Sequence, residues 1–262
     1  MSHISNFTKV FFEQGFTICP ANSLSSLSEL RDVIFDEARI LLGSNAGDCE
    51  RFFNEFHENK LDEMQLNDFR VELIKNFNGR VDGGRLVWEA FRDLLQDLVG
   101  PDVAVQKSVN LVIHRPGDTD QPPIHRDAPP NSPFEVVAWI PLVDCYDTKS
   151  MYLLDRQNTP HALAIMDNPA GNNGQDLLNY VAQNGRHRNV SYGEGLFFWT
   201  PLLHAIPVNR ENQTRWSINL RFKNVFSPYG KKGIPDYFRV LNLSPLTRLA
   251  IDWEKARCME KE

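Results

Sequence analysis

The chain has few cysteines, no long apolar run and no excess of positive charge, and each absence excludes a class of protein. Its four cysteines lie far apart and form no Cys-x-x-Cys pair, which argues against a zinc cage and against a thioredoxin-like motif. The first residues lack the apolar core of a signal peptide, and no later stretch is long enough to span a bilayer. We therefore expect a cytoplasmic protein with free thiols and no membrane partner.

The bulk charge gives no support for a nucleic-acid partner. The formal net charge is −6 and the isoelectric point is about 5.7, so a strongly anionic partner gains no general attraction, although a local basic pocket is compatible with these values. Single β-sandwiches and barrels often reach the length of this chain, which has 262 residues. We expect residues 1–262 to form one domain.

The first hundred residues have the apolar spacing of amphipathic helices, at intervals of three and four. Ser26 and Glu29 fit a capping box at the start of one stripe, and Gly43 fits its end. We expect a strand over 11–18 and helices over 27–41, 67–77 and 85–98. Together these elements predict a helical N-terminal buttress over residues 1–102.

From Val103 the apolar period changes to two, which is typical of strands. Strands are predicted over 103–113, 134–142, 151–154, 162–165, 196–199 and 215–222. This order predicts a mainly β fold with helical additions, namely a double-stranded β-helix (a cupin-like jelly roll) over 103–227. A polar insert over 168–188 fits a lid. Residues 228–262 fit a tail that ends in a closing helix, whose apolar face would carry Leu246, Leu249, Ala250 and Trp253.

Three residues have the side chains and the spacing of a metal site. His125 and Asp127 are two positions apart, so an extended backbone would direct both side chains to one face. A third candidate, His204, follows an apolar strand pattern later in the chain. Two imidazoles and one carboxylate on one face are the ligand set of non-heme Fe(II). A kinase catalytic loop is excluded, because no Gly-rich loop precedes His-Arg-Asp and no Asp-Phe-Gly follows it.

A strand over 215–222 separates polar from apolar side chains. Its polar residues are Arg215, Ser217, Asn219 and Arg221, and aromatic or aliphatic residues alternate with them. The polar face could be the solvated side of an edge strand, but we favour a face that lines the barrel lumen, because the neighbouring strand carries His204. An arginine on that face would suit a carboxylate, since guanidinium pairs with it through two hydrogen bonds.

Three other histidines are weaker ligand candidates. His114, His161 and His187 each fit a structural or exposed role better than a metal site. Arg186 and Arg188 flank His187 and could bind an anion with it, although such a group is more often a solvated loop. We therefore predict that the metal ligands are His125, Asp127 and His204.

The chain resembles the Fe(II)/2-oxoglutarate-dependent oxygenases, and within them the phytanoyl-CoA-hydroxylase-like branch. The resemblance covers residues 103–227, approximately. Within this branch, the chain is most similar to members from bacterial carbohydrate and aminoglycoside biosynthesis clusters. It is carried by five runs of sequence: Asn110-Leu-Val-Ile-His-Arg-Pro-Gly-Asp, His125-Arg-Asp, Glu135-Val-Val-Ala-Trp-Ile-Pro-Leu, Ser150-Met-Tyr-Leu-Leu-Asp and Arg215-Trp-Ser-Ile-Asn-Leu-Arg.

The resemblance implies a role for each candidate residue. His125, Asp127 and His204 would bind iron, and Arg215 with Ser217 would bind the distal carboxylate of 2-oxoglutarate. Apart from the resemblance, if the strand over 215–222 runs from a deep Arg215 toward the barrel mouth, Asn219 lies four residues on and Arg221 nearer the rim, so both are candidate substrate contacts. Asn110, on the polar face of an earlier strand, is a candidate for contact with co-substrate or substrate. The carboxylate of Asp127 argues against halogenation, because related halogenases have a small residue there.

The expected activity is oxidation of a C–H bond in a small polar molecule, such as a carbohydrate or aminocyclitol derivative. Molecular oxygen and 2-oxoglutarate would be consumed, and succinate and carbon dioxide released. Two alternatives stay open: a non-catalytic cupin-like module that binds metal or sugar, and a zinc- or manganese-dependent isomerase or hydrolase on the same fold.

Overall fold

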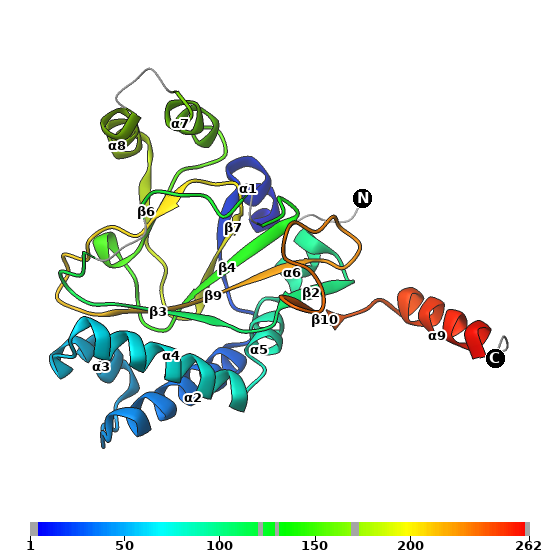
Figure 1. The fold of residues 1–262 in the computed structure, drawn as a ribbon, viewed down its shortest axis with the longest axis horizontal. Helices are drawn as coiled ribbons and strands as arrows, with labels where there is room; N and C mark the ends of the chain where they lie inside the picture. Colours follow the sequence, from blue (N-terminus) through cyan, green and yellow to red (C-terminus); the bar gives the residue numbers. More distant parts are fainter. Residues whose placement is uncertain (1–4, 120–122, 129–130, 169–172, 260–262) are drawn as a thin grey trace.

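Two antiparallel sheets form the centre of the protein, and helices cover the larger one. The computed structural model describes residues 5–119, 123–128, 131–168 and 173–259 (Figure 1). The larger sheet has the strand order β1-β7-β4-β9-β2-β10, with β3 also paired to β9, and the smaller sheet has the order β6-β5-β8. This arrangement confirms the predicted mainly β, double-stranded β-helix fold with helical additions.

The strands of the larger sheet are β1 (Phe16–Pro20), β2 (Val103–Gln106), β3 (Asn110–His114), β4 (Glu135–Pro141), β7 (Glu194–Trp199), β9 (Arg215–Asn224) and β10 (Phe238–Asn242). Those of the smaller sheet are β5 (Met151–Leu153), β6 (Arg186–Arg188) and β8 (His204–Ala205). The helices are α1 (Asn6–Gln14), α2 (Leu24–Leu42), α3 (Cys49–Asn54), η1 (Phe56–Asn59), α4 (Glu63–Arg80), α5 (Gly83–Ala90), α6 (Arg92–Val99), η2 (Asp147–Lys149), α7 (Thr159–Met166), α8 (Asn173–Asn184) and α9 (Pro245–Met259).

The two faces of β9 have different neighbours. Trp216 and the apolar residues that alternate after it join a core cluster with side chains of α2 to α6. The ring of Trp216 lies 4.6 Å from that of Phe53 and 4.9 Å from that of Phe56, between ring centroids. The opposite face of the sheet meets β5, through a second cluster that contains Trp139 and Leu153. The polar face of β9 is therefore directed into the lumen, as the sequence predicted.

Trp216 should contribute strongly to stability because it is fully buried among aromatic rings. Replacing it with alanine should lower the free energy of unfolding by about 3–5 kcal/mol, the usual effect of removing a large buried side chain. Urea unfolding followed by circular dichroism measures this change. The matched control is Trp253→Ala, since Trp253 is 65% exposed on α9 and should cost less than about 0.5 kcal/mol. Equal losses in the two variants would contradict the packing described.

Several predicted helix boundaries are wrong. The helix α2 begins at Leu24 after Ser23, so Ser26 and Glu29 do not form the predicted capping box, although Gly43 does end the helix at a φ of 61°. A capping box is found instead at the start of α4, between Asp62 and Gln65. The predicted helix over 85–98 is divided between α5 and α6 at Phe91, where φ is −129°.

Two predicted strands are helical or partly helical. Residues 11–14 belong to α1, which Ser5 caps by accepting a hydrogen bond from the backbone of Thr8 and which Gly15 ends in the left-handed region. Residues 162–165 belong to α7, which has Pro160 in its first turn. Apolar runs this short do not distinguish a strand from a buried helix by their period. The sequence analysis also missed α3 and β10.

The predicted insert over 168–188 contains α8 and β6, and its residues 169–172 lie outside the described part of the chain. Val181 of α8 packs in a small cluster with Leu154 and Leu203, and the hydroxyl of Tyr152 donates to the carbonyl of Val181. These contacts place α8 on the side of the smaller sheet that faces away from the lumen. Its role as a lid stays a prediction.

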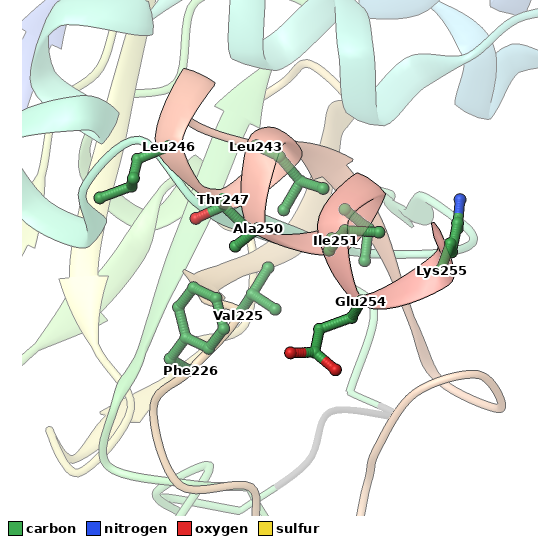
Figure 2. Close-up of a pocket in the computed structure, with 10 residues that line it drawn as sticks. Val225, Phe226, Leu243, Leu246, Thr247, Ala250, Ile251, Glu254 and Lys255 are labelled. Atoms are coloured by element: carbon green, nitrogen blue, oxygen red, sulfur yellow. The ribbon is translucent and has the colours of Figure 1, made fainter. Parts of the chain in front are cut away.

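The C-terminal helix α9 does not close onto the sheets as predicted. Figure 1 shows it extending from the end of β10, and its predicted apolar face is exposed, with Leu246 75% exposed. An apolar pocket lies between α9 and the end of β9, with Phe226 on one wall and Ala250 on the other (Figure 2). Within the described residues, no helix is both long and apolar enough to cross a membrane.

Candidate metal and carboxylate-binding site

The backbone brings His125 and His204 together. The two residues form an antiparallel bridge, in which the amide of His125 donates to the carbonyl of His204 at 3.0 Å and the amide of His204 donates to that of His125 at 2.8 Å. Their ring centroids are 4.4 Å apart. Two positions further on, the amide of Asp127 donates to the carbonyl of Thr200 at 3.1 Å. These hydrogen bonds hold His125 against β8 of the smaller sheet and Asp127 against the turn that follows β7 of the larger sheet.

The three side chains converge in the way a metal ion requires. One potential ligand atom from each of His125, Asp127 and His204 lies within 4.8 Å of the other two. In the described part of the chain, no other group of three or more histidine, cysteine, aspartate or glutamate side chains meets this condition. The structure therefore brings together the three residues that the sequence analysis selected, and their role as ligands stays a prediction.

Hydrogen bonds orient both imidazole rings. The Nδ1 atom of His125 lies 2.8 Å from the carbonyl of Pro123, and that of His204 lies 3.0 Å from the carbonyl of Leu202. A carbonyl only accepts, so each Nδ1 carries the hydrogen and each Nε2 keeps a lone pair for a metal. Burial lowers the pKa of His204, although Asp127 opposes this shift, and the ring is therefore ready to bind without losing a proton. Two imidazoles and one carboxylate fit Fe(II).

Arg215 is a buried cation whose hydrogen bonds are unsatisfied. Its side chain is fully buried at the start of β9, and Nε and both terminal nitrogens have no hydrogen-bond partner among the described residues. The hydroxyl of Ser217, on the same face, also has none there. Burial lowers the pKa of Arg215 to about 10, so it remains charged at neutral pH. Because a buried charge without a partner is costly, the guanidinium of Arg215 and the hydroxyl of Ser217 fit a carboxylate ligand.

His114 lies beside Arg215 on the same face of the sheet, which the sequence analysis did not anticipate. It pairs with Arg215 in the register of β3 and β9 and is fully buried, with no partner for Nδ1 in the described structure. Burial, helped by the charge of Arg215, lowers the pKa of His114 to about 4 and keeps its ring neutral. The alternation of Asn110, Val112 and His114 was the available signal, because it puts His114 on the polar face.

The other polar-face candidates lie further along the same strands. Asn110 and Asn219 are paired residues of β3 and β9, and Trp139 of β4 is the other neighbour of Asn219. Asn219 is half-buried, whereas Asn110 is exposed at the start of β3. Contact of either residue with a ligand stays a prediction.

Arg221 is closer to the metal triad than the sequence analysis supposed. We expected it near the rim, where it would be free to bind substrate, but its terminal nitrogen lies 2.8 Å from Oδ2 of Asp127 in an ion pair. The side chain of Arg221 also contacts Gln106 and Tyr237, two residues that the sequence analysis missed. Tyr237 lies beyond the predicted core, and no feature of the sequence around it indicated this contact.

The remaining candidates do not join the site. The exposed ring of His161 lies against that of Tyr180, and the ring of His187 lies against Tyr152. Arg188 lies over the ring of Phe16 at 4.3 Å, and Arg186 is exposed. The structure therefore does not assemble 186–188 into an anion-binding cluster.

Comparison with known proteins supports the fold. No protein-family model and no curated protein matches the sequence, but solved structures do. ThoJ, a non-heme monooxygenase solved with nickel, aligns with a TM-score of 0.57 and 16% identity over 91% of this chain and 84% of its own. SnoK, a non-heme alpha-ketoglutarate-dependent carbocyclase from nogalamycin biosynthesis, aligns with a TM-score of 0.53 and 17% identity over 89% of this chain and 89% of its own.

Apo EctD from S. alaskensis aligns with a TM-score of 0.56 and 13% identity over 88% of this chain and 81% of its own. At such identities a likeness establishes the fold and leaves the chemistry to be argued from the residues. The chain has the double-stranded β-helix fold of ThoJ, SnoK and EctD.

Proposed function

We propose that the protein is a non-heme Fe(II)/2-oxoglutarate-dependent oxygenase that oxidises a C–H bond of a small polar molecule. The observation that carries this proposal is the presence of two complementary sites in one lumen. The triad of His125, Asp127 and His204 fits Fe(II), and the guanidinium of Arg215, which no described residue satisfies, fits a carboxylate. A dicarboxylate co-substrate that also chelates metal would satisfy both sites at once.

Each residue of the site has a distinct part in this proposal. His125, Asp127 and His204 would hold Fe(II), which when bound supplies chelation of the co-substrate and activation of oxygen. Arg215 would bind the far carboxylate of 2-oxoglutarate, with Ser217 donating a further hydrogen bond, so the co-substrate is held by both ends. The carbonyls of Pro123 and Leu202 keep the imidazole rings in orientation through Nδ1.

The lumen beside the triad is largely apolar. Val137, Trp139, Leu153 and Phe198 form one buried cluster, and the ring centroid of Phe198 is 5.0 Å from that of His204. An apolar wall excludes water, which strengthens the polar interactions within the site and limits side reactions. The overall reaction would convert 2-oxoglutarate and oxygen to succinate and carbon dioxide as the substrate is oxidised.

Polar residues of β3 and β9 are the proposed contacts for substrate. Asn219 and Asn110 present amides on the lumen face, and amides suit the hydroxyl or amino groups of a carbohydrate or aminocyclitol derivative. Hydroxylation is the simplest outcome. The structures that resemble this one include a non-heme monooxygenase and a non-heme carbocyclase, so the fold serves more than one reaction.

A non-catalytic metal-binding module would share the triad, as would a zinc- or manganese-dependent isomerase or hydrolase. Neither alternative accounts for a second binding site inside the lumen. The buried Arg215, which has no hydrogen-bond partner in the described part of the chain, therefore favours the oxygenase over both.

The proposal is tested by titrating metal-free protein with Fe(II) and then with 2-oxoglutarate, in the absence of oxygen. We expect a visible metal-to-ligand charge-transfer band on addition of 2-oxoglutarate, because the co-substrate chelates the metal through its keto and carboxylate oxygens. His125→Ala should give no band, since one imidazole ligand is missing. A folded, iron-loaded protein without a band would contradict the oxygenase function and favour the alternatives.

A further inference from the structure

The carboxylate of Asp127 is held from outside the triad by an arginine. A terminal nitrogen of Arg221 lies 2.8 Å from Oδ2 of Asp127, and the two side chains are only 13% and 15% exposed. Ion pairs on an open surface contribute little because water and salt screen them, whereas a shielded pair holds its geometry more firmly. This contact uses one carboxylate oxygen of Asp127 and leaves Oδ1 for a metal ion.

Arg221 is itself fixed by two further side chains. Its other terminal nitrogen donates to the hydroxyl of Tyr237 at 2.7 Å and to Oε1 of Gln106 at 3.3 Å. The hydroxyl of Tyr237 donates in turn to Oε1 of Gln106 at 2.8 Å, and the amide nitrogen of Gln106 donates to the carbonyl of Ser108 at 2.8 Å. These hydrogen bonds run in one direction, from Arg221 through Tyr237 and Gln106 to the backbone of Ser108, whereas Nε of Arg221 has no partner among the described residues.

The strands hold these partners in place. Gln106 ends β2 and pairs with Phe238 at the start of β10, so Tyr237 enters the lumen from a segment that the sheet anchors. Gln106 is buried. The ammonium of Lys232 lies over the ring of Tyr237, 4.4 Å from its centroid. Arg221 therefore has little freedom to leave Asp127.

We infer that Arg221 is a positioning residue: it holds the Asp127 carboxylate in the orientation that a metal ion needs, and Gln106 and Tyr237 hold Arg221. The terminal torsion of an aspartate side chain has a broad energy minimum, so an unsupported carboxylate would sample many orientations. This inference rests on the proposed metal site, and it replaces the expected role of Arg221 in binding substrate.

The inference is testable because the charge of Arg221 and its effect on the orientation of Asp127 should change metal affinity in opposite directions. A positive guanidinium close to the site repels a divalent cation, so if only its charge mattered, removing it would tighten metal binding. If Arg221 positions the carboxylate, removing it should weaken binding, by the 10–100-fold that loss of a partner outside the ligand set usually costs. The direction of the change therefore decides between the two.

The experiment is a titration of metal-free protein with Co(II), without co-substrate, that measures the dissociation constant and the visible absorption of the bound metal. Arg221→Met should bind Co(II) 10–100-fold more weakly and with an altered spectrum. Arg221→Lys, which keeps the charge but loses the planar fork, should recover part of this loss. Tyr237→Phe keeps both residues of the ion pair, removes only the support, and should lose a few-fold in affinity.

Arg239→Met is the matched control, because Arg239 of β10 pairs with Asp82, the residue before α5, and not with Asp127. The Co(II) affinity and the spectrum of this variant should equal those of the original protein. Unchanged or tighter binding by Arg221→Met would overturn the inference while leaving the metal site intact. If Arg221→Met does not fold, unchanged affinity and spectrum in Tyr237→Phe would overturn it instead. Failure of the original protein to bind Co(II) would overturn the metal site itself.

Discussion

Arg215→Met should be more stable than the original protein when no ligand is present, yet should gain nothing from 2-oxoglutarate. The original protein keeps a fully buried guanidinium without a partner among the described residues, and methionine removes this charge while filling much of the same volume. Replacing buried charges by apolar residues often stabilises a protein by about 1–4 kcal/mol. The ligand-free variant should therefore unfold at a higher urea concentration.

Added 2-oxoglutarate, by contrast, should stabilise the original protein and not Arg215→Met. A ligand present at about 100 times its dissociation constant stabilises the folded protein by about 2.7 kcal/mol, which raises the melting temperature by several degrees. The iron-loaded original protein should show this increase with 2-oxoglutarate in the absence of oxygen, and Arg215→Met should not. Loss of the arginine should weaken co-substrate binding by at least about 100-fold, or roughly 3 kcal/mol.

Arg239→Met serves as the control here too, because it removes one arginine from the same sheet without touching the lumen. It should respond to 2-oxoglutarate as the original protein does. A less stable Arg215→Met that still gains stability from 2-oxoglutarate would show that the buried guanidinium has another function.

His204→Ala should abolish tight binding of Fe(II) while leaving the fold intact. The bridge between His204 and His125 consists of backbone hydrogen bonds, so removing the imidazole does not break it. Losing a ligand should weaken metal binding by more than the 10–100-fold cost of losing an outer partner. Anaerobic equilibrium dialysis followed by metal analysis measures the affinity.

His161→Ala is the matched control for that measurement, since His161 is exposed on α7 and lies against Tyr180. It should keep the full affinity for Fe(II). If both variants lost the metal equally, or if neither did, the assignment of His204 would be wrong.

The parts of the site that depend on side-chain alternation along an extended backbone could be predicted from the sequence. The alternation around Trp216 distinguished the lumen face of β9 from its helix-covered face, because side chains of a strand alternate strictly. The pair His125 and Asp127 followed from the same rule. His204 could be added because an apolar strand pattern led to it. These inferences depend on local spacing, which a single sequence contains.

The contacts that depend on distant pairing could not be predicted. The ion pair between Arg221 and Asp127 arises because β9 passes the segment that carries Asp127. Tyr237 contacts Arg221 only because β10 pairs with β2. No local pattern records such pairings. The predicted position of α9 was wrong for a related reason. Apolar residues at helical spacing show that a helix has an apolar face, but they do not show which part of the protein covers that face.

The arrangement of β9 also bears on how this site can change in evolution. Arg215, Ser217 and Arg221 lie on one strand, and three neighbouring strands fix its register. An insertion or deletion of one residue within β9 would rotate the side chains beyond it to the opposite face, where they would meet the helices. Related chains can therefore vary these side chains one at a time, but a single change of length in β9 would remove several of them from the lumen in one step.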